Sequence, residues 1–344
     1  MDNEKLIMKN DAMAEFKIAI VILNWNGKVL LEQFLPSVIE HSKEAIVFVA
    51  DNASTDESVA FVKSTFPTVK IIQNTENGGY AKGYNDALKH MEADVFCLLN
   101  NDVEVTKNWL LHIIKTFQEN PNTAIIQPKL LDYNNKTAFE YAGAAGGFID
   151  KFGYPYCRGR IFNTIENDNG QFNDISEIFW ASGACLFIRS HVFNALNGLD
   201  EAFFAHMEEI DLCWRAKNLG YSTMYVGTST IYHVGGATLS NANPKKTFLN
   251  FRNSLFALTK NANGHIFWLI FVRLLLDGVA GVKFLVELKP NHALAILKAH
   301  LSFYYHFKQL LSKRKFIKNK IKYYQITLIV VAYFIKRKTT FKSL

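Results

Sequence analysis

Residues 98 to 105 read LLNNDVEV, where an apolar run typical of a buried strand ends in three short polar side chains, Asn100, Asn101 and Asp102. The apolar pattern then resumes with Val103. A carboxylate and an amide oxygen two residues earlier are the kind of ligands that magnesium and manganese favour. Asn and Asp are also strong turn formers, so the stretch by itself indicates either a turn or a cation site. The loops that follow the neighbouring strands bear on this choice.

The first two hundred residues alternate short apolar runs with helical patterns. The runs are rich in β-branched residues and nearly free of charge, which is typical of parallel strands covered on both faces. They are IAIVIL (18–23), AIVFVA (45–50), VKII (69–72), VFCLL (95–99) and AIIQ (124–127). Between them, DESVAFVKSTF and YAKGYNDALKHM carry apolar residues at helical spacing. We therefore predict an α/β fold with a mostly parallel, Rossmann-like sheet.

Ligands of such sheets bind beyond the carboxyl ends of the strands. The first of these ends, NWNG, supplies an aromatic face and amides, and at the second Asp51 could accept hydrogen bonds from a nucleobase or a ribose. The loop NTENGGYAKGYN places Gly78 and Gly79 before a helix, which lets backbone N–H groups approach an anion. Neither the P-loop spacing nor G-x-G-x-x-G is present, which disfavours ordinary dinucleotide binding.

The composition narrows the class of protein. Of 344 residues, 49% are apolar and 14% aromatic, which excludes a disordered chain. The four cysteines are scattered without a C-x-x-C pair, which favours a reducing compartment over a disulfide framework or a cysteine zinc site. The N-terminal stretch MDNEKLIMKNDAMAEFK lacks the apolar core of a secretory signal. We expect the protein in the cytosol or on the inner membrane face.

Residues 130–174 are rich in Gly, Asn, Tyr and Asp and predict either loops and short strands that border a site or a flexible insert. A strand followed by a helix is expected in EIFWASGACLFIRSHVF, and a helix closed by Gly220 in HMEEIDLCWRAKNLGY. The first turn of that helix carries Glu208, Glu209 and Asp211. Acids in a first turn are favoured by the helix dipole, and they can also supply a general base.

The C-terminal region, residues 256–344, has a different character. Its apolar stretch 264–288 is interrupted by Arg273, Asp277, Lys283 and Glu287, so we predict amphipathic helices and not a membrane span. From Leu288 to the end there are thirteen Lys and Arg and no acid. Together with the apolar segment 323–335, this charge predicts contact with an anionic membrane surface. Core helices with solvated basic faces are the alternative, and nucleic acid is disfavoured because the basic residues flank apolar helices.

Taken together, the motifs resemble the inverting glycosyltransferases of family 2, particularly the rhamnosyltransferase-like members. The matching elements are VILNWNG, VADNASTDES, NTENGGYAKGYNDAL, LLNNDVEV, WASGACLFIRS, EEIDLCWRAKNLGY and IYHVGG, in the family's order. The resemblance covers about residues 16–255 and implies a glycosyltransferase A (GT-A) fold as the catalytic domain, after an N-terminal extension of residues 1–15. It also implies a nucleoside-diphosphate sugar donor and a divalent metal, Mn²⁺ or Mg²⁺.

The resemblance assigns roles to individual residues. Asn100-x-Asp102 occupies the place of the family's D-x-D motif, with Asn100 replacing its first Asp and Asp102 as the metal carboxylate. His233 matches a histidine that helps bind the metal or the diphosphate. The donor contacts that we expect are Asn24, Trp25, Asn26, Asp51, Asn52, Asn77, Gly78, Gly79, Lys82, Asn85, Asn100 and Asn101.

The resemblance also implies the acid–base group. Glu209 aligns with the family's catalytic Asp, with Glu208 as the alternative, and Asp211 is expected to position the helix start or Arg215. In WASGA, Trp180 is either a stacking face for a sugar or a core side chain. Substrate contacts are expected from Trp180, Ser182, Gly183, Ala184 and Arg215.

These expectations combine into one hypothesis. The chain transfers a hexosyl or deoxyhexosyl group, with rhamnosyl as the first choice, to a lipid-linked saccharide acceptor in cell-surface polysaccharide synthesis. It would work peripherally on the inner face of the cell membrane. The alternative is a noncatalytic nucleotide-sugar-binding or membrane scaffold protein of the same fold, which the Asn100 and Glu209 replacements keep open.

Overall fold

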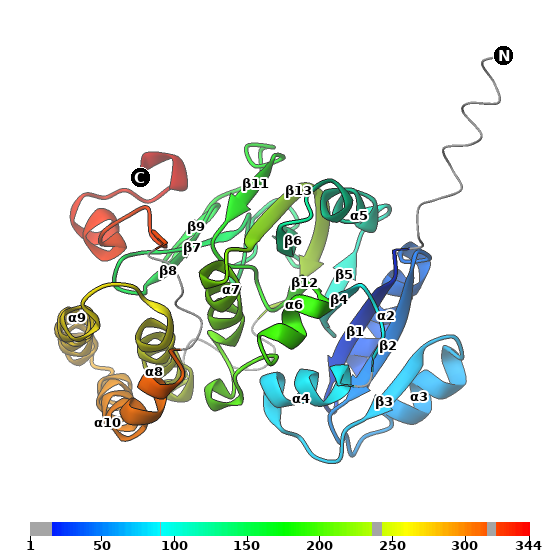
Figure 1. The fold of residues 1–344 in the computed structure, drawn as a ribbon, viewed down its shortest axis with the longest axis horizontal. Coiled ribbons are helices and arrows are strands. Elements are labelled where there is room, and N and C mark those ends of the chain that lie inside the picture. The colour runs from blue at the N-terminus through cyan, green and yellow to red at the C-terminus, as the bar shows by residue number, and fades with distance from the viewer. Residues whose placement is uncertain (1–15, 90, 236–242, 315–320) are drawn as a thin grey trace.

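The structure is a computed structural model that describes residues 16–89, 91–235, 243–314 and 321–344. The predicted N-terminal extension, residues 1–15, lies outside these ranges. A nine-stranded mixed sheet forms the centre of the molecule (Figure 1). Its strands are β1 (Ile18–Asn24), β2 (Ala45–Asp51), β3 (Lys70–Gln73), β4 (Val95–Asn100), β5 (Val103–Val105), β6 (Thr123–Asp132), β11 (Ile175–Ile178), β12 (Cys185–Arg189) and β13 (Ser222–His233).

The strands follow the order β11-β13-β6-β12-β4-β1-β2-β3, and β5 pairs with β13. The pairs β1–β2, β1–β4, β2–β3 and β6–β13 are parallel, whereas β5, β11 and β12 run antiparallel to their neighbours. The predicted α/β fold with a mostly parallel sheet is confirmed. The carboxyl ends of the parallel strands therefore meet at one edge of the sheet.

Helices cover both faces of the sheet, which explains the nearly continuous apolar runs. In β1, Ala19 and Val21 point into one apolar core, and Ile20 and Ile22 point into the other. On the side of Ile20 lie α2 (Lys28–His41), α3 (Ser58–Thr65) and α5 (Trp109–Glu119). On the side of Val21 lie α4 (Gly79–Leu88), α6 (Ser190–Ala195) and α7 (Glu208–Asn218).

A small second sheet fills the region that was expected to hold loops and short strands. It consists of β7 (Gly147–Ile149), β8 (Pro155–Cys157), β9 (Arg160–Ile161) and β10 (Thr164–Ile165). The indole of Trp180 lies against Gly147, where an added Cβ would come within 2.0 Å of the ring. This contact joins the small sheet to the loop that precedes β12.

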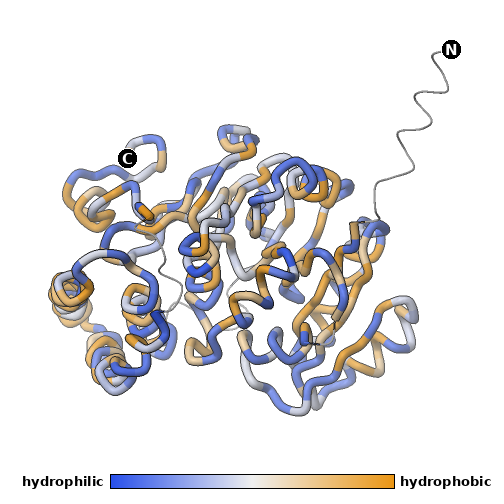
Figure 2. Tube along the Cα trace, viewed as in Figure 1, coloured by the Kyte–Doolittle hydropathy of each residue, from blue (hydrophilic) through white to orange (hydrophobic). Residues whose placement is uncertain are grey.

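Three helices gather at the end of the molecule opposite α2 and α3 (Figure 1). They are α8 (Pro244–Asn261), α9 (Ile266–Val286) and α10 (Pro290–Ser312), and α8 packs against α7. In α9, Arg273 and Asp277 are buried and paired with each other at 2.7 Å, whereas Lys283 is exposed. Within the described ranges, no helix is long and apolar enough to cross a membrane. Hydrophobic residues run along both α9 and α10 (Figure 2).

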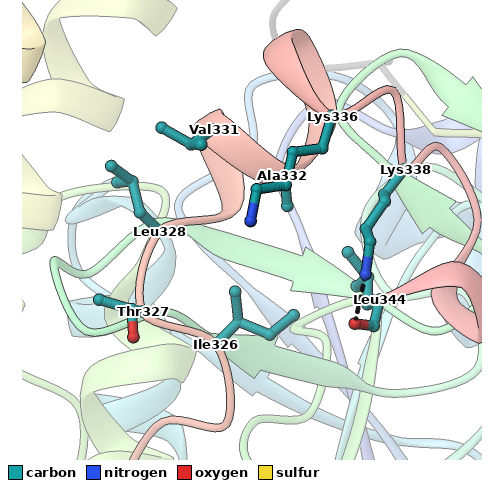
Figure 3. Close-up of a pocket in the computed structure, with 8 residues that line it drawn as sticks. All are labelled: Ile326, Thr327, Leu328, Val331, Ala332, Lys336, Lys338 and Leu344. Carbon is teal, nitrogen blue, oxygen red and sulfur yellow. Dashed lines mark hydrogen bonds between the residues drawn. The ribbon is translucent and has the colours of Figure 1, made fainter.

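The last described segment, residues 321–344, packs on the core. Its short helical turns are η2 (Val331–Ile335) and η3 (Phe341–Ser343). The ring of Tyr323 lies 4.7 Å from that of Trp214, and the Ile329 N–H donates to the buried Asp150 carboxylate. The stretch 323–335, which we expected at a membrane interface, is therefore anchored to the protein, although Ile335 stays exposed. Part of the segment lines a small cavity that Lys336 and Lys338 border (Figure 3).

Candidate active site

The tips of three parallel strands bring polar side chains together. The strand register sets Asn24 beside Asp51, and Leu23 beside Asn100. The Asn24 amide donates to the Asp51 carboxylate at 3.4 Å, and its oxygen accepts from the Asn101 amide at 3.0 Å. LLNNDVEV is thus tied by Asn101 to the tip of β1, so its turn is also part of a larger polar cluster.

A second set of asparagines joins the loops after β2 and β3. Asn52 is buried, and its amide donates to Asn77 at 2.9 Å and to the Gly79 carbonyl at 3.2 Å. The Asn77 oxygen also accepts from the Gly79 N–H at 3.1 Å. Gly79 has φ +77, a conformation that L side chains rarely adopt, so glycine suits the start of α4. These contacts fix the glycine-rich loop at the sheet edge.

The other side chains expected to bind the nucleotide-sugar donor differ in their exposure and in whether they already have protein partners. Trp25 is 55% exposed at the tip of β1, so its ring is open to a ligand. Asn26 instead accepts from the backbone N–H groups of the loop after β2. Lys82 forms an ion pair with Asp86 at 2.5 Å, and the Asn85 amide donates to the Leu199 carbonyl at 2.9 Å. Lys82 and Asn85 therefore already have protein partners.

His233, at the end of β13, lies between two carboxylates. Its Nε2 is 3.2 Å from Asp102, and its Nδ1 is 3.3 Å from Glu140. Burial lowers the pKa of His233, but the two carboxylates outweigh it and raise the pKa to about 10. The sequence did not single out Glu140. Its one signal was an acid within the Gly- and Ala-rich stretch FEYAGAAGG.

The residues around His233 could supply some, but not all, of the ligands of a cation. No group of three or more His, Cys, Asp or Glu able to hold a metal occurs among the described residues. The Asn100 amide nitrogen and the Asp102 carboxylate lie 3.3 Å and 3.2 Å from His233 Nε2. Ligands at 2.0–2.1 Å from an octahedral ion are spaced about 3 Å apart, so Asp102 and a deprotonated His233 could share one cation, and Asn100 could join them through its amide oxygen. Its remaining ligands would come from substrate oxygens or water.

The two acids at the start of α7 have different environments. Glu208 is buried with one carboxylate oxygen unpaired, and burial with the charge of Glu209 raises its pKa well above the usual value. Glu209 is partly exposed, and burial raises its pKa to about 7 despite its backbone N–H contacts. A carboxyl that titrates near neutral pH and remains accessible is suited to take a proton from a hydroxyl. Tyr80 lies within the electrostatic range of both acids.

The third acid of the first turn has a structural environment. Asp211 is fully buried and pairs with Arg215 at 2.7 Å and with Lys260 of α8 at 2.7 Å. Burial raises the pKa of Asp211, but Lys260 and Arg215 lower it below the usual value. Arg215 also donates to the carbonyls of Leu196 and Gly198. Both side chains thus connect α7 to its neighbours.

The loop before α7 is strained and is bound by two residues of α8. Phe204, His206 and Met207 have φ of 65, 68 and 75, in the left-handed region that non-glycine residues rarely occupy. The Asn253 amide lies within 3.0 Å of the carbonyls of Phe203, Ala205 and His206. Arg252 donates to the carbonyls of Ala202 and Phe203 and to the Asn253 oxygen. This loop leads directly into Glu208 and Glu209.

The WASGA loop approaches the site through its backbone. Trp180 is buried and donates from Nε1 to the Phe148 carbonyl at 2.8 Å, which is a core environment. The Ser182 N–H donates to Gln127 at 2.7 Å, and the Gly183 carbonyl accepts from the Tyr80 hydroxyl at 2.7 Å. Ala184 accepts the Asn100 N–H at 3.0 Å, which joins this loop to LLNNDVEV.

Strand β8 ends in a buried cysteine. The Cys157 thiol, at its end, is buried, which raises its pKa, and it responds to the charges of Arg160, Glu140 and Glu209. Glu140 and Glu209 are thus both within electrostatic range of one buried thiol.

Sequence comparison agrees with this arrangement. A family model described as glycosyl transferase family 2 matches residues 19–196, just over half of the 344 residues. The chain belongs to glycosyl transferase family 2. It is 22% identical over 231 residues to the N-acetylglucosaminyl-diphospho-decaprenol L-rhamnosyltransferase of Mycobacterium tuberculosis, covering 63% of this chain and 75% of that protein. It is 24% identical over 205 residues to a low-salt glycan biosynthesis hexosyltransferase of Haloferax volcanii, covering 58% and 61%.

Solved structures show the same fold. GalNAc-T7, solved with UDP, GalNAc and Mn²⁺, aligns with a TM-score of 0.59 at 14% identity, over 86% of this chain and 57% of that one. A mannosyltransferase from Pyrobaculum calidifontis, solved with GDP-Man and Mn²⁺, aligns with a TM-score of 0.51 at 14% identity, over 87% and 84%. This family 2 glycosyltransferase therefore has the GT-A fold that the sequence predicted.

Proposed function

We propose that this family 2 glycosyltransferase is an inverting enzyme that moves a hexosyl or deoxyhexosyl group from a nucleoside-diphosphate sugar to a saccharide. Rhamnosyl is the first choice, because the Mycobacterium tuberculosis relative is named a rhamnosyltransferase. The name of that relative also supports a lipid-linked acceptor. A role in cell-surface polysaccharide synthesis at the inner face of the cell membrane follows from such an acceptor.

The observation that carries the proposal is the contrast between the two acids of α7. Glu209 is partly exposed with a pKa of about 7, whereas Glu208 is buried and its pKa is raised further. Near neutral pH, Glu209 can therefore be an accessible carboxylate. In a single displacement, Glu209 takes the proton of the acceptor hydroxyl while that oxygen attacks the anomeric carbon. The bond from this carbon to the diphosphate breaks, and its electron pair leaves with the diphosphate.

The diphosphate would bind at the opposite side of the same region. Asp102, His233 and the Asn100 amide would hold a divalent cation, which supplies neutralisation of the charge on the leaving group when bound. The backbone N–H groups at the start of α4, near Gly78 and Gly79, favour an anion nearby. The exposed ring of Trp25 and the amide cluster at the strand tips are suited to a nucleoside.

The test is a screen of nucleotide sugars, with and without manganese, for thermal stabilisation and for donor hydrolysis. We expect one donor to stabilise the protein only with manganese and to be turned over. Glu209→Gln should keep donor binding and lose turnover, whereas Glu208→Gln should retain most of it. Full turnover by both variants would refute the base assignment. Donor binding without turnover in the wild-type protein would favour a noncatalytic nucleotide-sugar-binding protein.

A further inference from the structure

Helix α9 exposes a purely apolar side. Phe267, Phe271, Leu275, Val279, Val282 and Val286 recur every three or four residues, so they line one side of the helix. Each of them is between 51% and 78% exposed. The opposite side carries the buried Ile270, Arg273 and Asp277, which face the protein. Monomeric proteins rarely expose large contiguous apolar patches, so such a side indicates an interaction surface.

Helix α10 continues this surface. It runs antiparallel to α9. The ring centroids of Phe267 and Phe307 are 6.1 Å apart near one end of the pair, and those of Phe284 and His292 are 5.1 Å apart near the other. Its own exposed residues, Leu294, Leu297, Leu301, Tyr304 and Tyr305, are 48% to 85% exposed. Figure 2 shows hydrophobic residues along both helices, at the end of the molecule away from α2 and α3. We call the exposed sides of the two helices the α9–α10 face.

Positive charge accompanies this apolar face. Lys298 and Lys308 are exposed among the leucines and tyrosines of α10, and Lys283 is exposed at the side of α9. The exposed acid at this end, Glu287, is already paired with Lys283 at 2.9 Å and with Lys289 at 3.0 Å. Long lysine side chains can lie along an apolar surface and extend their amines to phosphate groups. A second copy of the chain would bring these lysines toward each other, whereas anionic headgroups complement them.

We propose that the α9–α10 face docks the protein flat on an anionic lipid bilayer. Its apolar side chains enter the boundary between headgroups and acyl chains, and its lysines contact lipid phosphates. Tyr304, Tyr305 and Trp268 are residue types that favour this boundary. The buried Arg273–Asp277 pair fixes α9 to the protein body, so the helix lies in the interface and does not cross the bilayer. This surface goes beyond the proposed transfer reaction and can be tested without it.

The experiment is co-sedimentation of the full-length protein with phosphatidylcholine vesicles, prepared with or without phosphatidylglycerol. We expect the wild-type protein to pellet with the phosphatidylglycerol vesicles and much less with the neutral ones. Phe271→Glu combined with Leu275→Glu should weaken binding by about 100-fold or more, because two large apolar side chains can no longer be buried. Lys298→Gln and Lys308→Gln should each weaken binding to anionic vesicles by about 5-fold.

Leu111→Glu is the matched control, because Leu111 is an equally exposed leucine on α5, at 58%. It should bind vesicles as the wild-type protein does, and all variants should keep the wild-type melting temperature and donor stabilisation. Unchanged vesicle binding by the α9 double variant would overturn the proposal. A wild-type dimer that this variant converts to a monomer in light scattering would overturn it in favour of a second copy. Vesicle binding by a protein that turns over no donor would refute the proposed function alone.

Discussion

Replacing Asn253 tests how the body of the protein positions Glu208 and Glu209, the acids that we propose for catalysis. The side chain is fully buried, and its amide faces three carbonyls of the strained loop before α7. An amide has two N–H groups, so Asn253→Ala removes at most two donated hydrogen bonds, together with the one that its oxygen accepts from Arg252, and leaves the carbonyls of Ala205 and His206 without this donor. Each unsatisfied buried group costs about 1–3 kcal/mol. We therefore expect the free energy of unfolding to fall by about 2–4 kcal/mol.

Asn253→Asp separates the donors from the size of the side chain. Aspartate has the same shape and still accepts from Arg252, but it has no N–H and would place negative charge against the carbonyls. It should destabilise the protein at least as much as Asn253→Ala. Ser254→Ala, one residue further along α8, is the control, because its hydroxyl is 3.9 Å from the Met207 sulfur and that contact is weak.

The assays are urea unfolding and the steady-state rate of donor turnover. Relaxation of the left-handed residues would move Glu209, so kcat should fall by about 10- to 100-fold, since misplacing a reacting group by 1 Å can cost this much. The KM for the donor should change little, because the donor site is built on other strand tips. Wild-type kcat and stability in both Asn253 variants would refute the reasoning.

Three further predictions concern the charged groups. The value of kcat/KM should fall about tenfold per pH unit below pH 7, because Glu209, with a pKa of about 7, must be deprotonated to act as a base. Glu208→Gln should leave the midpoint of this pH dependence near 7. Asp102→Asn should abolish the stabilisation that donor gains from added manganese, measured by thermal shift relative to the melting temperature of the same variant without ligand. Lys260→Met should lower the free energy of unfolding by about 2–4 kcal/mol, because Asp200 and the buried Asp211 each lose one of two cationic partners and keep only Lys313 or Arg215; a loss under about 1 kcal/mol in urea unfolding would contradict this.

Local patterns in the sequence were sufficient to predict most of the central sheet. The run IAIVIL corresponds to β1 (Ile18–Asn24), and Gly220, with φ +96, follows the end of α7 as predicted. Strand β13 (Ser222–His233) is one long strand with an irregularity between Val226 and Thr230. The direction of β12 was not predictable, because an apolar run of five residues reads the same for a parallel or an antiparallel strand.

The site residues that lie at the ends of strands could be predicted from the sequence. Those that come from distant loops and helices could not. Asp102 and His233 were expected together because of the family resemblance, and the structure pairs them at 3.2 Å. Glu140 reaches His233 across 93 residues of sequence from an irregular loop, and no periodicity marks such a contact. Asn253 likewise contacts a loop about fifty residues earlier, and in the sequence it is an ordinary polar residue of a helix.

The ion pairs of Lys260 have a consequence for how such enzymes can be shortened or recombined. Lys260 of α8 reaches both Asp200 and Asp211, and Lys313 also binds Asp200 at 2.8 Å. A chain that ends at residue 255 would keep Asp200 and Asp211 but lose Lys260 and Lys313. The segment matched by the family model stops at residue 196, before both acids and both lysines, so it contains none of these ion pairs. In chimeras between relatives, α7 and α8 should be exchanged together, because Asp211 of α7 pairs with Lys260 of α8.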